Sequence, residues 1–286
     1  MTQSDFNNIP IHELDTANVG IQVKNIAHKN HYDFTTQHRH HYFELMFFIE
    51  GGGVNLIDFV EYEVKSNSCY IIYPNQIHLL NRAPGSHGVV IQFKRESIIS
   101  AKLQRLLQEQ AWSGKGAELF HEDEALMKKT LSLVDTLTTS SDEDLTYCLE
   151  TRQHLLHAII FDLFSTVNKN EKTEILANDI YQFLQLIDTH FKEEQKVSFY
   201  LDQLSISDKK LSQLSKKFTG TSPLQVIHER ILLEAKRLLV AGEQSHKEIA
   251  YDLGFDSPAS FSAFIKKKTG LTASEVQAQM AEIHKQ

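Results

Sequence analysis

Two histidines and a glutamate, His38, His40 and Glu44, lie close together in the first part of the chain. Successive side chains of a β-strand point to opposite faces, so residues an even number of positions apart share a face. In an extended segment these three side chains therefore point the same way. Imidazole nitrogens and carboxylate oxygens suit Fe, Mn, Ni or Zn, so the group could hold a divalent metal ion.

The surrounding segment, residues 31 to 93, has the pattern of β-structure. We expect strands at about 41–49, 54–64, 69–73 and 89–93, separated by a glycine run and by two proline turns. Short strands at this spacing indicate a sandwich or a barrel. Between residues 96 and 167 proline is absent and apolar residues recur at helical spacing, which predicts a helical segment.

The last part of the chain carries a series of helix-end signals. Ser222 before Pro223, and the tetrapeptides that begin at Ser245 and Thr272, are typical of helix starts. Four glycines follow apolar runs, where the left-handed residue beyond a helix end is expected: Gly220, Gly242, Gly254 and Gly270. These signals predict a domain of short helices.

Two segments of this region, about 197–220 and 245–270, have the pattern of helix-turn-helix units. Their ends, Lys-Lys-Phe-Thr-Gly and Lys-Lys-Lys-Thr-Gly, indicate an internal repeat. The helix expected between them, 223–240, would span about 27 Å at 1.5 Å per residue. That length suits two recognition helices one DNA turn, about 34 Å, apart. An ordinary helical bundle with solvated lysines is the alternative.

Residues from about 180 to 282 resemble the DNA-binding domain of AraC/XylS-type regulators. The match lies in Ile206-Ser207-x3-Leu211-x2-Leu214-x-Lys216-x3-Gly220, in Arg230-Ile231-x3-Ala235-x2-Leu238-Leu239, and in Ile249-Ala250-x3-Gly254-Phe255-x-Ser257-x3-Phe261-x3-Ile265-Lys266-x3-Gly270-x-Thr272. The chain departs from the family pattern at Leu201, Ser215 and Ala273. The resemblance implies a bacterial transcription regulator, often dimeric, with an effector-sensing domain ahead of the DNA reader.

The resemblance also places the DNA contacts. We expect them at Lys209, Lys210, Ser212, Gln213, Lys216 and Lys217 in the first unit and at Ser257, Ser260, Ser262, Lys266 and Lys267 in the second. Lysine and glutamine can pair with base edges, whereas Pro258, Ala259 and Ala263 offer only shape or methyl contacts. We therefore predict that the first unit reads sequence directly and that the second adds affinity for the DNA backbone.

The spacing His38-x-His40-x3-Glu44-x6-Gly51 is similar to the first motif of cupin barrels, and His78 stands where the second motif has a histidine. The resemblance implies that His38, His40, Glu44 and His78 meet inside a barrel and could bind a metal. The same pattern is usual in the sensor domains of AraC-type regulators, where it often holds none. We therefore expect no cofactor and keep a divalent metal as the alternative.

Strand parity also predicts an effector site. Tyr42, Met46 and Phe48 share the face of the histidines, and Tyr70 and Ile72 join them if their strand keeps phase. A barrel with aromatic walls and a few polar groups suits one small organic ligand. The expected effector site is His38, His40, Tyr42, Glu44, Met46, Phe48, Tyr70, Ile72 and His78. The alternative is that the aromatic side chains only fill a small barrel.

Composition limits the class of protein. The chain has 286 residues, 41% of them hydrophobic, which excludes a disordered chain. No apolar run reaches the roughly 18 residues of a membrane span, and the polar start predicts no secretory signal, so we expect a cytoplasmic protein without a membrane partner. We expect an α+β multidomain chain: a cupin-like β-barrel or jelly roll at 1–96, a helical connector at 97–173, and an all-α DNA-binding domain at 174–286.

Together these features predict a transcription regulator, not an enzyme, that binds double-stranded DNA and is controlled by a small-molecule effector. A homodimer is expected, and a contact with RNA polymerase is open. The dimer contact would be an apolar stripe in the connector, which could equally pack on the barrel: Leu145, Leu149, Leu156 and Ile160. One alternative is a metal-dependent cupin enzyme with a helical appendage. Another, favoured by the net charge of -8, is a sensor that acts through protein partners.

Overall fold

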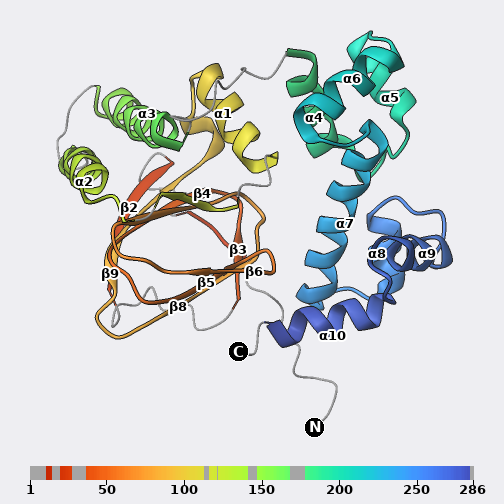
Figure 1. Ribbon diagram of the computed structural model, residues 1–286, viewed down its shortest axis with the longest axis horizontal. Helices are drawn as coiled ribbons and strands as arrows, with labels where there is room; N and C mark the ends of the chain where they lie inside the picture. The colour runs from red at the N-terminus through yellow and green to blue at the C-terminus, as the bar shows by residue number, and fades with distance from the viewer. Residues whose placement is uncertain are drawn as a thin grey trace. The chain divides into compact units, whose positions relative to one another are not determined.

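The computed structural model describes residues 11–14, 20–27, 37–112, 116–120, 122–140, 147–167 and 178–283. The chain divides into two compact units, Pro10–Thr173 and one that contains Glu174–Gln286. The first combines β-sheets with helices, and the second is helical throughout its described part (Figure 1). None of the described helices has both the length and the apolar character that a membrane span needs.

The strands of the first unit form two main sheets. They are β1 (Ile11–His12), β2 (Ile21–Ala27), β3 (Arg39–His40), β4 (Phe43–Glu50), β5 (Gly53–Ile57), β6 (Val60–Glu63), β7 (Ser68–Ile72), β8 (His78–Arg82), β9 (His87–Phe93) and β10 (Glu118–Phe120). A five-stranded sheet has the order β10-β7-β4-β9-β2, and a three-stranded sheet has the order β6-β5-β8. All their pairings are antiparallel. β1 pairs in parallel with β3. The expected barrel or jelly roll is thus built as separate sheets.

The central strand β4 is buried on both faces, and its alternation divides the interior into two cores. Leu45 and Phe47 belong to the core on the helical side, whereas Met46 and Phe48 belong to the core between the sheets. We call the second the inter-sheet core; its buried members are Ile26, Met46, Phe48, Ile57, Val64, Tyr70, Ile72, Val90 and Ala117. Met46, Phe48, Tyr70 and Ile72 therefore face the same core, as strand parity predicts.

Three helices cover the outer face of the five-stranded sheet: α1 (Ala101–Trp112), α2 (Glu124–Thr139) and α3 (Cys148–Val167) (Figure 1). Leu156 and Ile160 of α3 are fully buried in the core shared with the sheet. The expected dimer stripe therefore packs on its own unit at these two positions; Leu149 is partly buried, and Leu145 lies outside the described residues. Arg152 ties α3 to β2 by donating to the carbonyl oxygen of Ile21 at 2.8 Å.

Four features of this unit differ from the sequence prediction. β1 and β2 precede the expected β-region, β8 lies between two of the expected strands, and β10 interrupts the expected helical segment. The single strand expected at 54–64 is a hairpin, β5 and β6, because Asp58 and Phe59 both have positive φ and turn the chain. Such a two-residue turn is usually marked by Asn-Gly or Asp-Gly, which this chain lacks at that place.

The second unit consists of seven described helices. They are α4 (Asn178–His190), α5 (Val197–Leu204), α6 (Asp208–Thr219), α7 (Pro223–Ala241), α8 (His246–Asp252), α9 (Pro258–Thr269) and α10 (Ala273–Ile283). Ser207, Ser222, Ser245 and Ser257 each cap a helix by accepting a backbone N–H. α6, α7 and α9 end at glycines in the left-handed region. The helix predicted at 223–240 is α7, and its bounds are correct to within one residue.

The helix α7 connects the two helix-turn-helix units. The α5–α6 pair lies near its start and the α8–α9 pair near its end (Figure 1). Its buried face includes Ile227, Ile231 and Leu239, all fully inaccessible. At 1.5 Å per residue its 19 residues span about 28 Å.

Candidate functional site

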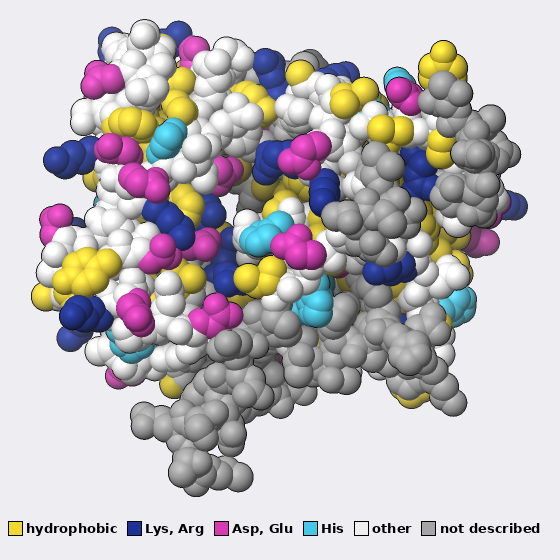
Figure 2. All heavy atoms as spheres, turned by 180° about the vertical axis from the view of Figure 1, so that it is seen from behind, with side chains coloured by type: hydrophobic (Ala, Val, Ile, Leu, Met, Phe, Trp, Pro, Cys, Tyr) yellow, Lys and Arg dark blue, Asp and Glu magenta, His cyan; other side chains and the backbone are white. Residues whose placement is uncertain are grey.

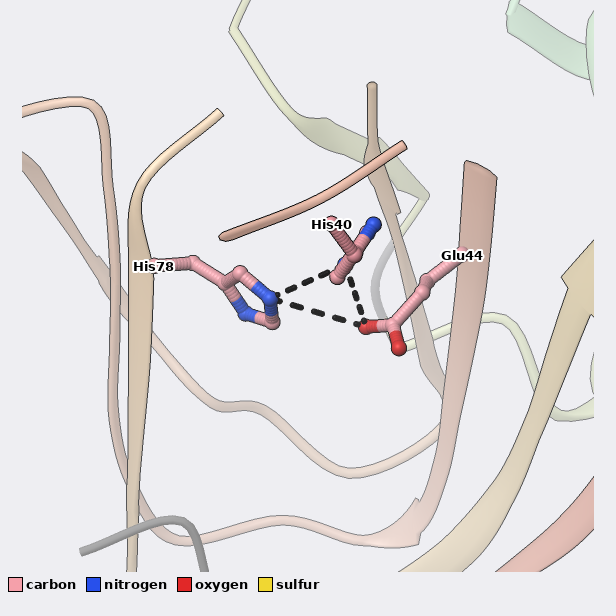
Figure 3. Close-up of side chains that lie close together, drawn as sticks. All are labelled: His40, Glu44 and His78. Atoms are coloured by element: carbon pink, nitrogen blue, oxygen red, sulfur yellow. Dashed lines mark hydrogen bonds and ion pairs between the residues drawn. The ribbon is translucent and has the colours of Figure 1, made fainter. Parts of the chain in front are cut away.

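His40, Glu44 and His78 come together inside the first unit (Figure 3). His40 ends β3, Glu44 is the second residue of β4, and His78 begins β8. His40 Nε2 lies 3.1 Å from His78 Nε2 and 3.5 Å from Glu44 Oε2. His78 Nε2 lies 3.9 Å from the same carboxylate oxygen, and all three residues are fully buried. Three separate strands thus bring three potential ligand atoms to one point.

Neighbouring groups fix how these side chains point. His40 Nδ1 donates to the carbonyl oxygen of Tyr42 at 2.7 Å, which leaves Nε2 facing the other two residues. The ring of Tyr42 also stacks on His40, with centroids 4.0 Å apart. Gln92, opposite Glu44 in the β4–β9 pairing, donates from Nε2 to Glu44 Oε1 at 2.7 Å. The other oxygen, Oε2, faces the histidines.

His38 lies beside this group. Its backbone pairs with His78, and the two rings lie 4.0 Å apart between centroids. Among the described residues, the group whose ligand atoms all lie within 4.8 Å of one another is His40, Glu44 and His78, without His38. The ring of His12 in β1 lies edge-on to the ring of His38, with centroids 5.1 Å apart. The four-residue ligand set implied by the cupin resemblance is therefore reduced to three in this structure.

The charges of the group follow from burial and proximity. Burial alone would raise the pKa of Glu44, but His40, His78 and the hydrogen bond from Gln92 outweigh it and hold that pKa well below its usual range. Burial, followed by the neighbouring His38, lowers the pKa of His78 well below that of a free imidazole. Burial and the Glu44 charge raise the pKa of Tyr42. An ionised carboxylate thus faces a neutral imidazole in a fully buried place.

The expected apolar lining also comes together. Met46, Phe48, Tyr70 and Ile72 all belong to the inter-sheet core and are fully buried. Asn55 of β5 enters the same interior: its Nδ2 donates to Met46 Sδ at 3.7 Å, and its Oδ1 has no hydrogen-bond partner among the described residues. A buried amide oxygen without a partner costs free energy, so it marks a place where a polar ligand atom would be accommodated.

Three polar residues at this site were not predicted: Gln92, Asn55 and His12. Gln92 and Asn55 are not metal-ligand types, so no motif singles them out. Strand alternation could have predicted both. Asn55 has the same parity in β5 as buried Ile57, and Gln92 has the same parity in β9 as buried Val90. His12 lies in a two-residue strand that has no periodic pattern to predict it.

In the second unit, α6 buries Leu211 and Ser215 and exposes the opposite face. Five predicted DNA contacts are exposed on α6: Lys209, Lys210, Gln213, Lys216 and Lys217; Ser212 is partly buried. The ammonium group of Lys210 forms an ion pair of 2.6 Å with Asp179 of α4, which directs this side chain toward its own unit. Among the predicted contacts on α6, Lys209 and Gln213 therefore offer exposed side chains near the helix start.

The helix α9 has the same plan. Phe261 and Ile265 are buried, whereas Ser260, Ser262, Lys266 and Lys267 are exposed. Ser257 is occupied as the helix cap, accepting from the backbone N–H of Ser260 at 3.1 Å. On the face drawn in Figure 2, basic and acidic side chains are interspersed, so any attraction for DNA there must come from local groups.

Comparison with known families identifies both units. Residues 23–159 match the AraC-like ligand binding domain, and residues 200–279 match a helix-turn-helix domain. The chain belongs to the AraC family. Its AraC-type architecture, an N-terminal effector-binding domain followed by a helix-turn-helix DNA-binding domain, confirms the function predicted from the sequence.

Two named relatives match over most of their length. The HTH-type transcriptional activator RhaS of Citrobacter koseri is 22% identical over 237 residues, which cover 81% of this chain and 84% of RhaS. RhaS of Escherichia coli O1:K1 is 21% identical over 235 residues, with coverage of 81% and 84%. Among solved structures, ToxT from Vibrio cholerae is 16% identical and superposes with a TM-score of 0.44, covering 91% of this chain and 98% of ToxT.

Proposed function

We propose that this AraC-type regulator reads double-stranded DNA by placing α6 and α9 in two successive major grooves. The observation that carries the proposal is the repeated unit itself. Both helices are capped by a serine, bury an apolar face and end at a left-handed glycine after a run of lysines. The helix α7 separates them by a length close to one turn of DNA.

The two recognition helices differ in what they offer DNA. Lys209 and Gln213 on α6 carry groups that can pair with guanine or adenine edges, each good bidentate pair giving about 1–3 kcal/mol of discrimination. On α9, Ala259, Ser260 and Ala263 are short, and the lysines at its end suit phosphate groups. We therefore assign direct readout to α6 and backbone affinity to Lys266 and Lys267 of α9.

We place the effector in the first unit, on the side of β4 that faces the three-stranded sheet. The proposed contacts are His38, His40, Tyr42, Glu44, Met46, Phe48, Tyr70, Ile72 and His78. The unpartnered oxygen of Asn55 supports a ligand with at least one polar group there. For such a ligand to control transcription, it must bind one functional state of the regulator more tightly than another.

We further propose that the regulator acts in the cytoplasm as a homodimer and has no catalytic activity of its own. Its named relatives are transcriptional activators, which supports this role. The dimer surface must lie elsewhere than Leu156 and Ile160, because these residues are buried within one chain. A contact with RNA polymerase belongs to the same proposal.

The experiment that tests DNA reading is selection of bound sequences from a random double-stranded pool with the purified full-length chain. We expect one enriched motif that occupies two stretches about one helical turn apart. The affinity for the enriched sequence should fall steeply as salt rises from 50 to 200 mM, because phosphate contacts release counterions. No enrichment, together with salt-independent affinity, would contradict the proposal and favour a sensor that acts through protein partners.

A further inference from the structure

We propose that His40, Glu44 and His78 bind one divalent first-row transition-metal ion in the N-terminal unit. These three residues also belong to the proposed effector site. The suggestion that the ion takes part in effector binding therefore rests on the proposed function. The binding itself can be measured without DNA.

The distances between the ligand atoms support the proposal. The three atoms lie 3.1, 3.5 and 3.9 Å from one another. Ligands that share one ion at bonds of about 2.1 Å lie roughly 3.0–3.4 Å apart, so small side-chain movements bring all three into bonding distance. The side chains in Figure 3 converge on a common point from three strands.

The neighbours of these residues are arranged as supports for metal ligands. A ligating histidine usually donates its second ring nitrogen to a carbonyl or a carboxylate, which orients the ring and increases its basicity. His40 does so to the carbonyl oxygen of Tyr42. Gln92 holds Oε1 of Glu44 and thereby turns Oε2 toward the histidines. Gln92 is therefore a positioning residue for Glu44.

Charge balance points the same way. A buried carboxylate is costly unless positive charge or hydrogen bonds compensate it. Oε2 of Glu44 faces the two imidazoles of His40 and His78, and Oε1 accepts from the amide of Gln92. A divalent cation would compensate the carboxylate and use the lone pairs of both imidazoles. Two imidazoles and one carboxylate suit Fe²⁺, Zn²⁺, Mn²⁺ or Ni²⁺ and leave coordination positions for water or an effector.

The test is a Co²⁺ titration of the untagged full-length chain after treatment with a chelator. We expect one equivalent of bound Co²⁺, visible absorption bands from nitrogen and oxygen ligands, a higher thermal unfolding midpoint, and displacement by Zn²⁺. Metal analysis of the chain purified without chelator should find up to one first-row transition-metal ion per chain. Absence of Co²⁺ binding by the folded wild-type chain overturns the proposal.

Variants locate the ion. Glu44→Gln keeps the size of the side chain and should weaken Co²⁺ binding at least 100-fold, as should His78→Gln. Gln92→Leu should weaken it about 10–100-fold, the usual effect of losing a supporting hydrogen bond. The matched control is His41→Gln, because His41 is exposed and bonds to Asn75 instead; it should leave Co²⁺ binding unchanged.

Two outcomes separate this inference from the proposed function. Co²⁺ bound equally well by folded Glu44→Gln and His78→Gln would place the ion elsewhere and overturn the assignment. If either variant fails to fold, the wild-type titration decides. Sequence-selective DNA binding by a chain that binds no metal would refute the metal site alone. Metal binding by a chain that selects no DNA sequence would refute the proposed function alone.

Discussion

Glu234 of α7 lies between two arginines in the DNA-binding unit. Its Oε2 accepts from Arg230 at 2.9 Å and from Arg237 at 3.5 Å, and all three side chains are largely buried. Arg230 also reaches Asp188 of α4 at 3.2 Å and covers the ring of Phe191. This network fixes α7 against α4, and removing the charge of Glu234 would take away a buried carboxylate that both arginines contact.

Glu234→Gln should therefore lower the free energy of unfolding by about 3 kcal/mol, the usual cost of breaking a buried ion pair from one side. Although burial opposes its ionisation, Arg230 and Arg237 hold the pKa of Glu234 below its usual value. On acidification the unfolded chain binds the proton first. The stabilisation by this carboxylate is therefore complete above about pH 5, begins to fall as the pH approaches 4, and is lost as the pH passes through the lower pKa of the folded state. Chemical denaturation between pH 7 and pH 4 should show a flatter profile for the variant than for the wild type. Glu229→Gln, at an exposed position on the same helix, is the control and should behave like the wild type.

Gln213 and Lys266 should have separable effects on DNA binding. Gln213→Ala should reduce discrimination between the selected sequence and its single-base variants by about 10–100-fold, because it removes a base contact. Lys266→Ala should weaken binding to all sequences alike. It should also reduce the slope of log K against log[salt] by about one, because one phosphate contact is lost. Fluorescence anisotropy with labelled duplexes at several salt concentrations checks both. Equal losses on all sequences for Gln213→Ala would contradict the assignment of readout to α6.

At the residue scale, the sequence predicts side chains that belong to a motif and misses those that only support it. His40 and Glu44 could be found by type and parity. Strand parity could have placed Gln92 on the inner face of β9, but not its role, which depends on the pairing of β4 with β9 that brings it opposite Glu44. Ser215 is a second case: the chain departs from the family pattern there, yet Ser215 is fully buried, and its hydroxyl donates to the carbonyl oxygen of Thr221 at 2.8 Å.

Among the elements, the turn between α8 and α9 depends on Gly254. Its φ is +74°, and a Cβ at this position would collide with the carbonyl oxygen of Lys192. Gln195 of the same segment donates to the carbonyl oxygen of Leu253 at 2.7 Å, so backbone passes closely over this turn. Any side chain at Gly254 must displace one of the two segments.

Gly254→Ala should destabilise the second unit by more than 2 kcal/mol, combining about 1–2 kcal/mol for the left-handed backbone with the collision. Gly270→Ala is the matched control, because Gly270 has a φ of +79° and nothing within 4 Å of an added Cβ. Gly270→Ala should lower the free energy of unfolding only by about 1–2 kcal/mol, the cost of the left-handed backbone. Thermal unfolding of both variants measures the difference, and equal destabilisation would show that the close approach at Gly254 has no effect.

The helix α3 is a structural element of the first unit. Leu156→Ala should lower the free energy of unfolding by about 2–5 kcal/mol, because it opens a cavity in a fully buried core. The sedimentation mass of the folded variant should equal that of the wild type. Lys129→Ala, which removes an exposed ion pair between α2 and α3, should cost at most about 1 kcal/mol. A change in mass with little loss of stability would instead make Leu156 a dimer contact.

The helices of the second unit were predictable because each end carries its own local signal. Ser245 and Glu248 form the complete capping box that the sequence suggests, and Thr272 and Glu275 bond in the same way. The strands β1, β2, β8 and β10 were not predicted, because their stability comes from partners that are distant in sequence. β10, for example, is three residues long and exists through its pairing with β7.

For the whole molecule, the two units carry the two halves of an AraC-type regulator: the first holds the buried histidine–glutamate group and the second holds the recognition helices. A ligand of the first unit can change DNA affinity only through a difference in its own affinity for the DNA-bound and free states. The same factor must then appear in both directions. An effector that tightens DNA binding tenfold must itself bind tenfold more tightly to the DNA complex.

The central claim is that α6 and α9 occupy successive major grooves on one face of a duplex. Methylation interference on the selected DNA sequence tests it, because methylation of guanine N7 blocks contacts in the major groove. We predict interfering guanines in two segments about 10 base pairs apart on the same face. Interference confined to one segment, or two segments on opposite faces, would contradict the account.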